Sequence, residues 1–440
     1  MDGVKSLRQK ERIKLAKALT LNLKASPIRR VWIPKAGPSE LRPLGIPTIY
    51  DRAKQQLARF ALEPEWDQRR FEPNSYGFRP GRGCHDAKEA IYLNIHRAPK
   101  GKYVLDADIR KCFDTIDHEA YLTKLQTWPK MSQQIKAWLK AGVMEGGTLI
   151  STRGVGTPQG GVIRPPFANV AHHGMEPMLK PWVKTLNLES ASGRQISLTN
   201  RAHTLGIIRY ADDFVVRHKG LTVVNEAREQ IQQWLAPMGL ELKDSKTRLA
   251  HTDKATMDAQ SGFDFLFLVS IKRYLVGKYS RGKLWMEAKT LIKPSKSALT
   301  KHLNHIKSKL KELQDPASVV NTLNPIIRGW CNDSVVSKRI YNICRQAVYE
   351  KRIAWAKRKH ANRSRNWVYK KYYVLVGKRR KFSSSGTDNK VLMCHDDTKI
   401  VTHVKVNGSA SVYDGNDLYW SHRRTHFSGK RDATLRIKIC

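Results

Sequence analysis

Two adjacent carboxylates, Asp212 and Asp213, are the residues of this sequence that most directly suggest chemistry. They lie between two short apolar runs in the segment IIRYADDFVV, residues 207–216. β-Branched and aromatic residues on both sides predict the two strands of a hairpin, with the acids at its turn. Neighbouring carboxylates repel each other and burial raises their pKa, so the pair needs a cation unless it lies on a solvated turn.

A third acid is predicted on a strand at residues 103–109, YVLDADI, where alternation places Asp108 on one face. Carboxylates on a strand and a hairpin suit Mg²⁺, which prefers oxygen ligands. Two such ions can stabilise the attacking and leaving oxygens of an in-line phosphoryl transfer. Lys35 and Arg42 could neutralise a triphosphate, and Phe113 follows Asp108 closely enough to lie near the same site.

The composition points to a nucleic-acid partner. The 440 residues allow two or three domains, and 80 Lys and Arg against 38 acids give a formal charge of +42. Charge of this size favours binding to a polyanion, although an architectural basic protein would share it. The acids in ordered segments are what distinguish an enzyme from that alternative.

The cysteines and the apolar runs restrict the compartment. Six scattered cysteines without a C-x-x-C pair favour reduced thiols over disulfides or a complete zinc site. His302 and His305 are three residues apart, which indicates a surface helix pair rather than a metal site. No apolar run approaches the roughly 20 residues of a membrane span and no signal peptide is visible. We expect a soluble protein of the bacterial cytoplasm or of an organelle, neither secreted nor membrane-bound.

Periodicity and turn residues predict the elements that position these groups. Strands are expected at residues 31–33, 41–46, 262–269 and 399–406, and helices at 51–65, 86–96, 168–178 and 225–238. Leu299, Leu303, Ile306, Leu310 and Leu313 form one apolar helix face, as in the core of a helical bundle. Residues 351–382 hold 13 Lys and Arg and no acids, with six aromatic residues interleaved. That mixture favours stacking on RNA or single strands over a plain solvated face.

The order of several motifs resembles group II intron-encoded proteins, the reverse transcriptase/maturase family. The matching blocks are RRVWIPK with RPLGIPTIYDRAKQQ, then NSYGFRPGRG, VLDADIRKCFDTIDHE, TPQGGVI, RYADDFVV, KDSKT, GFDFL, LNPIIRGWCN and HVKVNGSASVYDGNDLYW. The resemblance implies an α+β right-hand polymerase fold, with fingers and palm at residues 1–275 around a small antiparallel catalytic sheet. A helical thumb or maturase domain at 285–375 and a basic DNA-binding-like segment at 376–440 would follow.

The resemblance also implies roles for individual residues and the partners that they meet. Asp108 and Asp212 would ligate two Mg²⁺ ions with help from Asp213, and Lys35, Arg42, Gln159 and the steric gate Phe113 would bind the deoxynucleoside triphosphate. Arg79 would contact the template backbone. Group II intron RNA would be bound by Arg328, Trp330, Lys370 and Lys371. The expected substrates are an RNA template with a DNA primer or a target DNA.

Departures from the family pattern motivate one alternative. Arg164 and Pro166 are atypical in the loop after Gln159, and Phe267 replaces a glycine near the primer grip. The sequence also begins within a motif that the family precedes with an extension, and it ends before an HNH endonuclease would begin. A polymerase-impaired RNA-binding splicing factor, or a truncated relic, is therefore the alternative to an active RNA-directed DNA polymerase.

Overall fold

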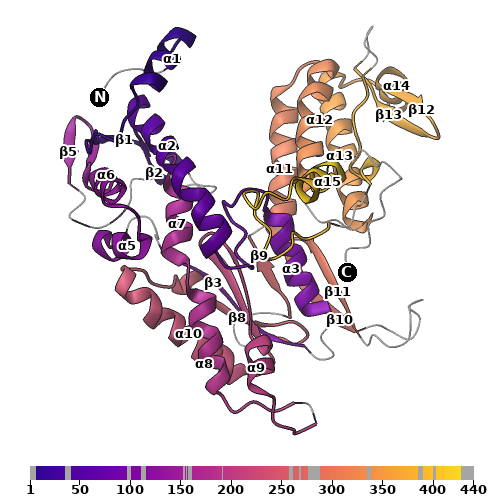
Figure 1. Ribbon diagram of the computed structural model, residues 1–440. Helices are drawn as coiled ribbons and strands as arrows, with labels where there is room; N and C mark the ends of the chain where they lie inside the picture. Colours follow the sequence, from indigo (N-terminus) through magenta and orange to yellow (C-terminus); the bar gives the residue numbers. More distant parts are fainter. Residues whose placement is uncertain are drawn as a thin grey trace. The chain divides into compact units, whose positions relative to one another are not determined.

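The computed structural model describes most of the chain and divides it into two compact units (Figure 1). The described residues are 6–34, 41–96, 101–110, 115–151, 154, 156, 161–190, 192–256, 261–266, 269–275, 288–333, 338–384, 390–399 and 403–427. The first unit takes its residues from 1–91, 107–248 and 405–440, and the second from 92–106 and 249–404. The segment 376–440 is thus shared between the two units.

The first unit is built from two small sheets and the helices around them. Its elements are α1 (Gln9–Ala18), β1 (Ile28–Pro34), β2 (Leu41–Ile46), α2 (Ile49–Glu65), η1 (Trp66–Arg70), α3 (Cys84–His96), β3 (Tyr103–Asp108), α5 (His118–Leu125), α6 (Pro129–Lys140), β4 (Val143–Glu145), β5 (Thr148–Ile150), α7 (Arg164–His172), α8 (Met175–Thr185), α9 (Leu198–Thr204), β6 (Gly206–Tyr210), β7 (Asp213–His218), α10 (Leu221–Leu235), η2 (Ala236–Met238), η3 (Asp244–Lys246), β8 (Arg248–His251) and α15 (Asp417–Phe427). α3, β3 and β8 cross the boundary between the units.

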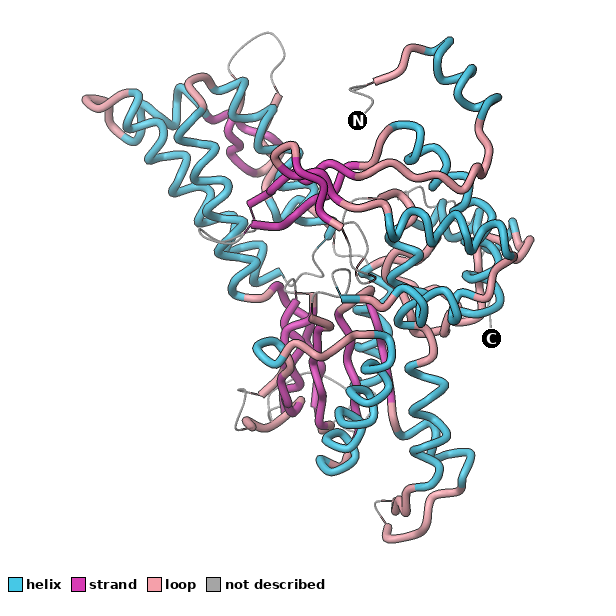
Figure 2. Tube along the Cα trace, turned by 90° about the vertical axis from the view of Figure 1, so that its left-hand side faces the viewer, coloured by secondary structure: helices cyan, strands magenta, loops and turns pink. Residues whose placement is uncertain are grey.

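The first sheet has the strand order β2-β1-β4-β5 and the second the order β6-β7-β3-β8. β6 and β7 form an antiparallel hairpin whose register runs from Gly206 opposite Arg217 to Tyr210 opposite Asp213. The amphipathic helix α10 packs against β7 and buries Val224 and Ile231. Figure 2 shows helices (cyan) lying alongside strands (magenta). Burial of such an apolar face is what fixes a helix against a sheet.

Most of the elements expected from the sequence are confirmed, and three are wrong. The single strand expected at 262–269 is two antiparallel strands, β9 (Phe263–Phe265) and β10 (Val269–Leu275), because the chain reverses after Phe265, where Leu266 has a φ of 54°. The helix expected at 168–178 is two helices, α7 and α8, because the chain turns at Gly174 with a φ of 103° that other residues rarely adopt. The strand expected at 399–406 is absent from its described residues, 399 and 403–406. Cys84, Cys331, Cys344 and Cys394 are free thiols, as expected.

The second unit contains a helical bundle with a small sheet before it and a hairpin after it. Its elements are β9 (Phe263–Phe265), β10 (Val269–Leu275), β11 (Ala288–Pro294), α11 (Lys296–Glu312), α12 (Pro316–Asp333), α13 (Lys338–Lys359), α14 (Arg365–Tyr372), β12 (Tyr373–Val376), β13 (Arg379–Phe382) and η4 (His395–Asp397). The strands are ordered β11-β10-β9, with β12 and β13 as a separate antiparallel pair. None of the helices in the described part of the chain is long and apolar enough to cross a membrane.

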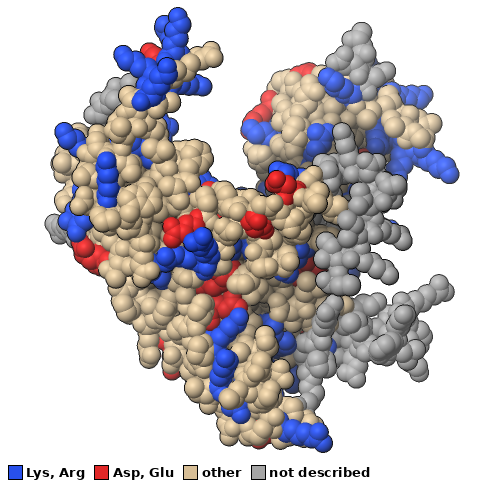
Figure 3. All heavy atoms as spheres, viewed as in Figure 1, with Lys and Arg blue, Asp and Glu red and all other residues tan. Residues whose placement is uncertain are grey.

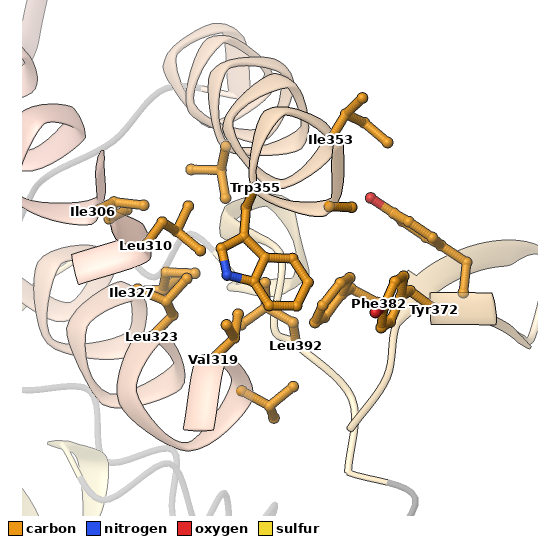
Figure 4. Packing of buried hydrophobic residues seen from close by; sticks show 14 of the residues in the cluster. Ile306, Leu310, Val319, Leu323, Ile327, Ile353, Trp355, Tyr372, Phe382 and Leu392 are labelled. Atoms are coloured by element: carbon orange, nitrogen blue, oxygen red, sulfur yellow. The ribbon is translucent and has the colours of Figure 1, made fainter. Parts of the chain in front are cut away.

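The bundle core explains the apolar face on α11 and corrects the reading of the aromatic segment. Ile306 and Leu310 are buried in this core, as predicted. Trp355, Tyr372 and Phe382 are buried in the same cluster (Figure 4), so their rings are not surfaces on which a base could stack. The cations between them remain exposed because long basic side chains can extend past a packed core into water.

The prediction that His302 belongs to a surface pair with His305 is wrong, because His302 is buried. Its Nε2 lies 2.8 Å from the Nε2 of His395, and its ring stacks on Trp330 with 4.4 Å between centroids. Burial, followed by the charge of His395, lowers the pKa of His302 to about 3. Burial and the charge of Arg352 lower the pKa of His395 to about 4. Both rings are therefore neutral in the folded second unit near neutral pH.

This pair predicts acid sensitivity of the second unit. Because both folded pKa values lie below the unfolded value of about 6.5, the unfolded chain binds more protons in acid. The stabilisation is present above about pH 6.5 and is lost as the pH falls toward the pKa values of the folded state. For each histidine, the free energy of unfolding falls by at most about 1.4 kcal/mol for every pH unit. Urea unfolding at about pH 7.5 and about pH 5, followed by pulsed hydrogen exchange in α12, measures the loss.

Two variants isolate the contribution of the pair. His302→Gln removes one titrating ring and should reduce the difference between the two pH values. His305→Gln changes an exposed histidine on the same helix and should leave the difference unchanged. Equal pH dependence in wild type and His302→Gln would contradict the prediction.

Candidate active site

The two adjacent acids lie at the tip of the β6–β7 hairpin, as the sequence predicted. Tyr210 and Asp213 close the ladder, so Ala211 and Asp212 form a two-residue turn. Ala211 has a φ of 57°, a left-handed conformation that costs a non-glycine residue roughly 1 kcal/mol. The tight turn holds the Asp212 and Asp213 carboxylates on a rigid ladder rather than on a mobile loop.

Asp108 is brought to the same place by the sheet. It is the last residue of β3, which neighbours β7. The next residue, Ile109, donates its backbone N–H to the carbonyl of Asp212 at 3.3 Å. One backbone hydrogen bond therefore ties the end of the acid-bearing strand to the acid-bearing turn.

The three carboxylates repel one another in this arrangement. Burial raises the pKa of Asp213 to about 7, with further contributions from the charges of Asp212 and Asp108. Burial and the charge of Asp108 also raise the pKa of Asp212, while Lys246 and Arg164 act in the opposite direction. Such a set of hard oxygen donors gains free energy when a divalent cation neutralises it, and the donors suit Mg²⁺.

Lys246 supplies part of the missing positive charge, a role that sequence reasoning did not assign. Its Nζ donates to the Asp108 carboxylate from the short helix η3. The backbone positions this helix, because the N–H of Lys243 donates to the carbonyl of Asp108 at 2.8 Å. The sequence signal for this residue was the KDSKT motif, which follows the hairpin motif in the order of the resemblance.

The acids are not gathered into a ready-made metal cage. Among the described residues, no group of three or more His, Cys, Asp or Glu side chains is arranged to hold a metal ion. Asp108 is instead paired with Lys246. A cation would enter by displacing this ammonium group, and oxygens from a bound substrate would complete its ligand set, as is usual for Mg²⁺.

The loop at residues 74–83 supports the hairpin from its outer edge. The N–H of Tyr76 donates to the carbonyl of Arg209, and the N–H of Arg209 donates to that of Asn74, each at 2.9 Å. Gly77 passes so close to the turn that a Cβ there would lie 2.3 Å from the nitrogen of Ala211. This loop is therefore an additional edge partner of β6.

A buried polar network locks the same region. The side-chain amide of Asn169, on α7, donates to the carbonyl of Gly77 at 2.8 Å, and its oxygen accepts from Arg209. Arg209 also pairs with Glu72, which His173 contacts as well. Burial opposes ionisation of Glu72, but the hydrogen bond from His173 and the charge of Arg209 outweigh it and lower its pKa. Satisfied networks of this kind restrict a core to one arrangement.

Arg79 is placed differently from the expectation that it contacts the template. Its guanidinium is buried, donating to Asp67 Oδ1 at 2.6 Å and to the carbonyls of Glu72 and Ser75. Its third nitrogen donates to the Asp67 carbonyl, so four of the five guanidinium N–H groups have acceptors within the fold and the side chain is buried away from solvent. Arg79 shapes the 74–83 loop from within.

The residues expected around the nucleotide are only partly described. Arg42 is exposed on β2, opposite Ile33 of β1. Lys35, Phe113, Gln159 and Phe267 lie outside the described residues. Pro166 lies in the first turn of α7, where a missing backbone N–H costs little because that group would have no helical partner.

The residues expected to bind intron RNA lie on the second unit and differ in exposure. Arg328 on α12 and Lys370 and Lys371 on α14 are exposed. Trp330 is half-buried because its ring stacks on His302. Figure 3 shows Lys and Arg side chains around β12 and β13 on this unit, and over α1 on the first unit. Each group forms a basic surface suited to a phosphate backbone.

Carboxylates at the end of one strand and on the turn of the neighbouring hairpin define the palm of a template-directed polymerase. Residues 33–268 match the family model of reverse transcriptase (RNA-dependent DNA polymerase), and residues 296–373 match the group II intron, maturase-specific domain. The chain therefore belongs to the reverse transcriptase family.

Individual relatives agree with this placement. The chain is 30% identical over 278 residues to the group II intron-encoded protein LtrA of Lactococcus lactis subsp. cremoris, covering 52% of this chain and 45% of that protein. It is 31% identical over 261 residues to protein YkfC of Escherichia coli (strain K12), covering 54% of this chain and 65% of that protein. The chain thus spans less than two thirds of the length of either relative.

The close approach of Gly77 to the catalytic turn gives a direct test of the hairpin support. In Gly77→Ala the added methyl group meets the backbone of Ala211, which must move, so polymerase activity should fall roughly 100-fold. Gly83→Ala is the matched control, since nothing lies within 4 Å of a Cβ there. Primer extension measures both, and equal activities would refute the role of this contact.

Proposed function

We propose that the chain is an RNA-directed DNA polymerase and intron maturase, which binds group II intron RNA, assists its splicing and copies RNA into cDNA. The hydrogen bond between Ile109 and Asp212 carries the proposal, because it joins the ends of the two acid-bearing elements. Support comes from the two family matches that cover this site and the helical bundle.

In this proposal Asp108 and Asp212 hold two Mg²⁺ ions, with Asp213 assisting. When bound, the ions neutralise the phosphate oxygens and stabilise the attacking and leaving oxygens of nucleotidyl transfer. The rigid hairpin and the strand end hold these carboxylates in one geometry, which reduces reorganisation during the reaction. Lys246 neutralises Asp108 between substrates and keeps the acids together.

The nucleotide and its template are assigned to residues of the first unit. Lys35 and Arg42 would neutralise the triphosphate, Gln159 would line the pocket, and Phe113 would exclude a ribose 2′-hydroxyl by its bulk. The 74–83 loop would contact the template through its exposed surface, where Phe78 is half-exposed. A deoxynucleoside triphosphate, an RNA template and a DNA primer or target DNA are therefore the proposed substrates.

Replacing Asp212 by Asn tests the polymerase assignment. The amide keeps the size of the side chain but removes the charge that binds the cation, so extension of a DNA primer on an RNA template with Mg²⁺ should fall about 1,000-fold or more. Asp244→Asn is the control, because this carboxylate is exposed and its ion-pair partner in the described part of the chain is Arg228. Wild-type protein that folds and binds RNA but extends no primer would leave the polymerase-impaired splicing factor as the function.

The exposed lysines of α14 test the RNA-binding assignment. Lys370→Ala with Lys371→Ala should weaken intron RNA binding about 10-fold and reduce the slope of log affinity against log salt by about 1.5, because two phosphate contacts are lost. Lys184→Ala with Lys219→Ala removes the same charge from exposed positions on the first unit and should change little. Filter binding at several salt concentrations distinguishes the two pairs.

A further inference from the structure

The last described part of the chain, residues 405–424, packs onto the first unit through buried polar contacts rather than forming a free basic tail. We call it the C-terminal strap. Residues 405–420 contain one lysine and two aspartates, so most of the strap carries little positive charge. The strap therefore has its main partners within the first unit rather than on a polyanion.

Asp86, near the start of α3, is the first anchor. Its Oδ1 accepts from the backbone N–H of Val406 at 2.7 Å and from the guanidinium of Arg423 at 2.6 Å. Its Oδ2 accepts from the N–H of Gly83, the last residue of the 74–83 loop. Asp86 and Arg423 are at most 9% exposed, so this ion pair is shielded from water and would be costly to break on one side.

Arg82, near the end of the loop, is the second anchor and joins the strap to the residue that precedes the loop. One amino group donates to the carbonyl of Pro73 at 2.8 Å. The other donates to the carbonyls of Gly408 and Ala410 in the strap, each at 2.8 Å. A single buried guanidinium thus bridges both segments through three backbone acceptors.

Asp67 is the third anchor and reaches the middle of the loop. Its Oδ2 accepts from the hydroxyl of Ser411 in the strap at 2.5 Å, while its Oδ1 accepts from Arg79 in the loop. Trp420 adds apolar cover: a Cβ at Gly81 would lie 2.5 Å from its ring, so only glycine fits beneath it. The strap therefore contacts the loop directly at Gly81 and Arg82, and it reaches Arg79 and Gly83 through Asp67 and Asp86.

The 74–83 loop is also the edge partner of β6 and touches the catalytic turn through Gly77. We propose that the strap is an intramolecular brace for the polymerase site, with Arg82, Asp86 and Arg423 as positioning residues. They hold the loop, and through it the turn that carries Asp212, in the geometry that catalysis needs. This inference rests on the proposed polymerase function for its consequence, but the brace itself is a property of the fold.

Two neighbouring arginines on α15 provide a matched test in the full chain. Arg423 is buried against Asp86, whereas Arg424 is exposed, so the two Ala variants lose the same charge from adjacent positions. Arg423→Ala should lower kcat for primer extension about 10-fold or more at saturating template–primer, because a small displacement of the site is enough for such a loss. Arg424→Ala should change kcat by less than about 2-fold.

Hydrogen–deuterium exchange gives a readout that does not need activity. Arg423→Ala should speed exchange in peptides covering residues 74–83, and Arg424→Ala should not. Protection in α10, an element of the same unit outside these contacts, reports whether the variant is folded. Ser411→Ala removes only the hydroxyl that reaches Asp67 and should give the same pattern in a milder form. Asp86→Ala also removes the acceptor for the N–H groups of Val406 and Gly83, so it should speed exchange more than Arg423→Ala. The two effects should add less than fully in the double variant, because both variants lose the same ion pair.

The outcomes separate the brace from its rivals. If both arginine variants only weaken template binding, equally and in a salt-dependent way, the strap is a nucleic-acid-binding surface and the brace is refuted. Unchanged exchange in residues 74–83 and unchanged kcat in folded Arg423→Ala and Ser411→Ala would also refute it. If wild-type protein extends no primer, the polymerase proposal fails while the exchange experiment still decides whether the brace exists.

Discussion

Repulsion among three carboxylates, one buried and two half-buried, is the constraint on which the rest of this structure depends. After burial, the charge of Asp108 raises the pKa of Asp212, and the charges of Asp212 and Asp108 raise the pKa of Asp213. Such an arrangement persists only where the backbone leaves the side chains no alternative. Here the two-residue turn and the hydrogen bond from Ile109 to Asp212 provide that restraint, and Lys246 offsets part of the charge. A bound divalent cation would relieve the repulsion that remains.

The residues that hold the β6–β7 hairpin in place form a buried polar network, in which each side chain is positioned by its hydrogen-bond partners. Arg209 holds Asn169 and Glu72 beneath the hairpin, and the 74–83 loop lies along β6. Buried polar groups are costly when unpaired, so a network with its partners in place has one favoured arrangement and resists small shifts. This rigidity suits a site that must hold two reacting groups in line over many cycles. Apolar packing alone would allow more repacking than such chemistry tolerates.

The features that could be predicted from the sequence are those determined by residues close together in the chain. The hairpin and the acid-bearing strand have a period of two and a turn that are visible within about ten residues. Arg79 and His302 were misplaced because their partners, Asp67 and His395, are fixed only by the tertiary fold. A segment that interleaves aromatic and basic residues has the same sequence pattern whether its rings stack on RNA or pack in a core, and Trp355 and Phe382 pack in a core. Lys246 lies in a recognised motif, but its pairing with Asp108 depends on how η3 is folded back.

The anchoring of residues 405–424 to the first unit has a consequence for biosynthesis. The loop at residues 74–83 leaves the ribosome long before its partners Val406 and Ala410 exist. At about 5–20 residues per second, the intervening stretch takes on the order of half a minute to synthesise. During that interval the loop lacks its contacts with residues 405–424. The β6–β7 hairpin of the nascent chain would therefore lie beside a loop that is not yet fully held in place. Translation of residues 405–424 would thus determine when the support of the loop, and of the hairpin beside it, becomes complete.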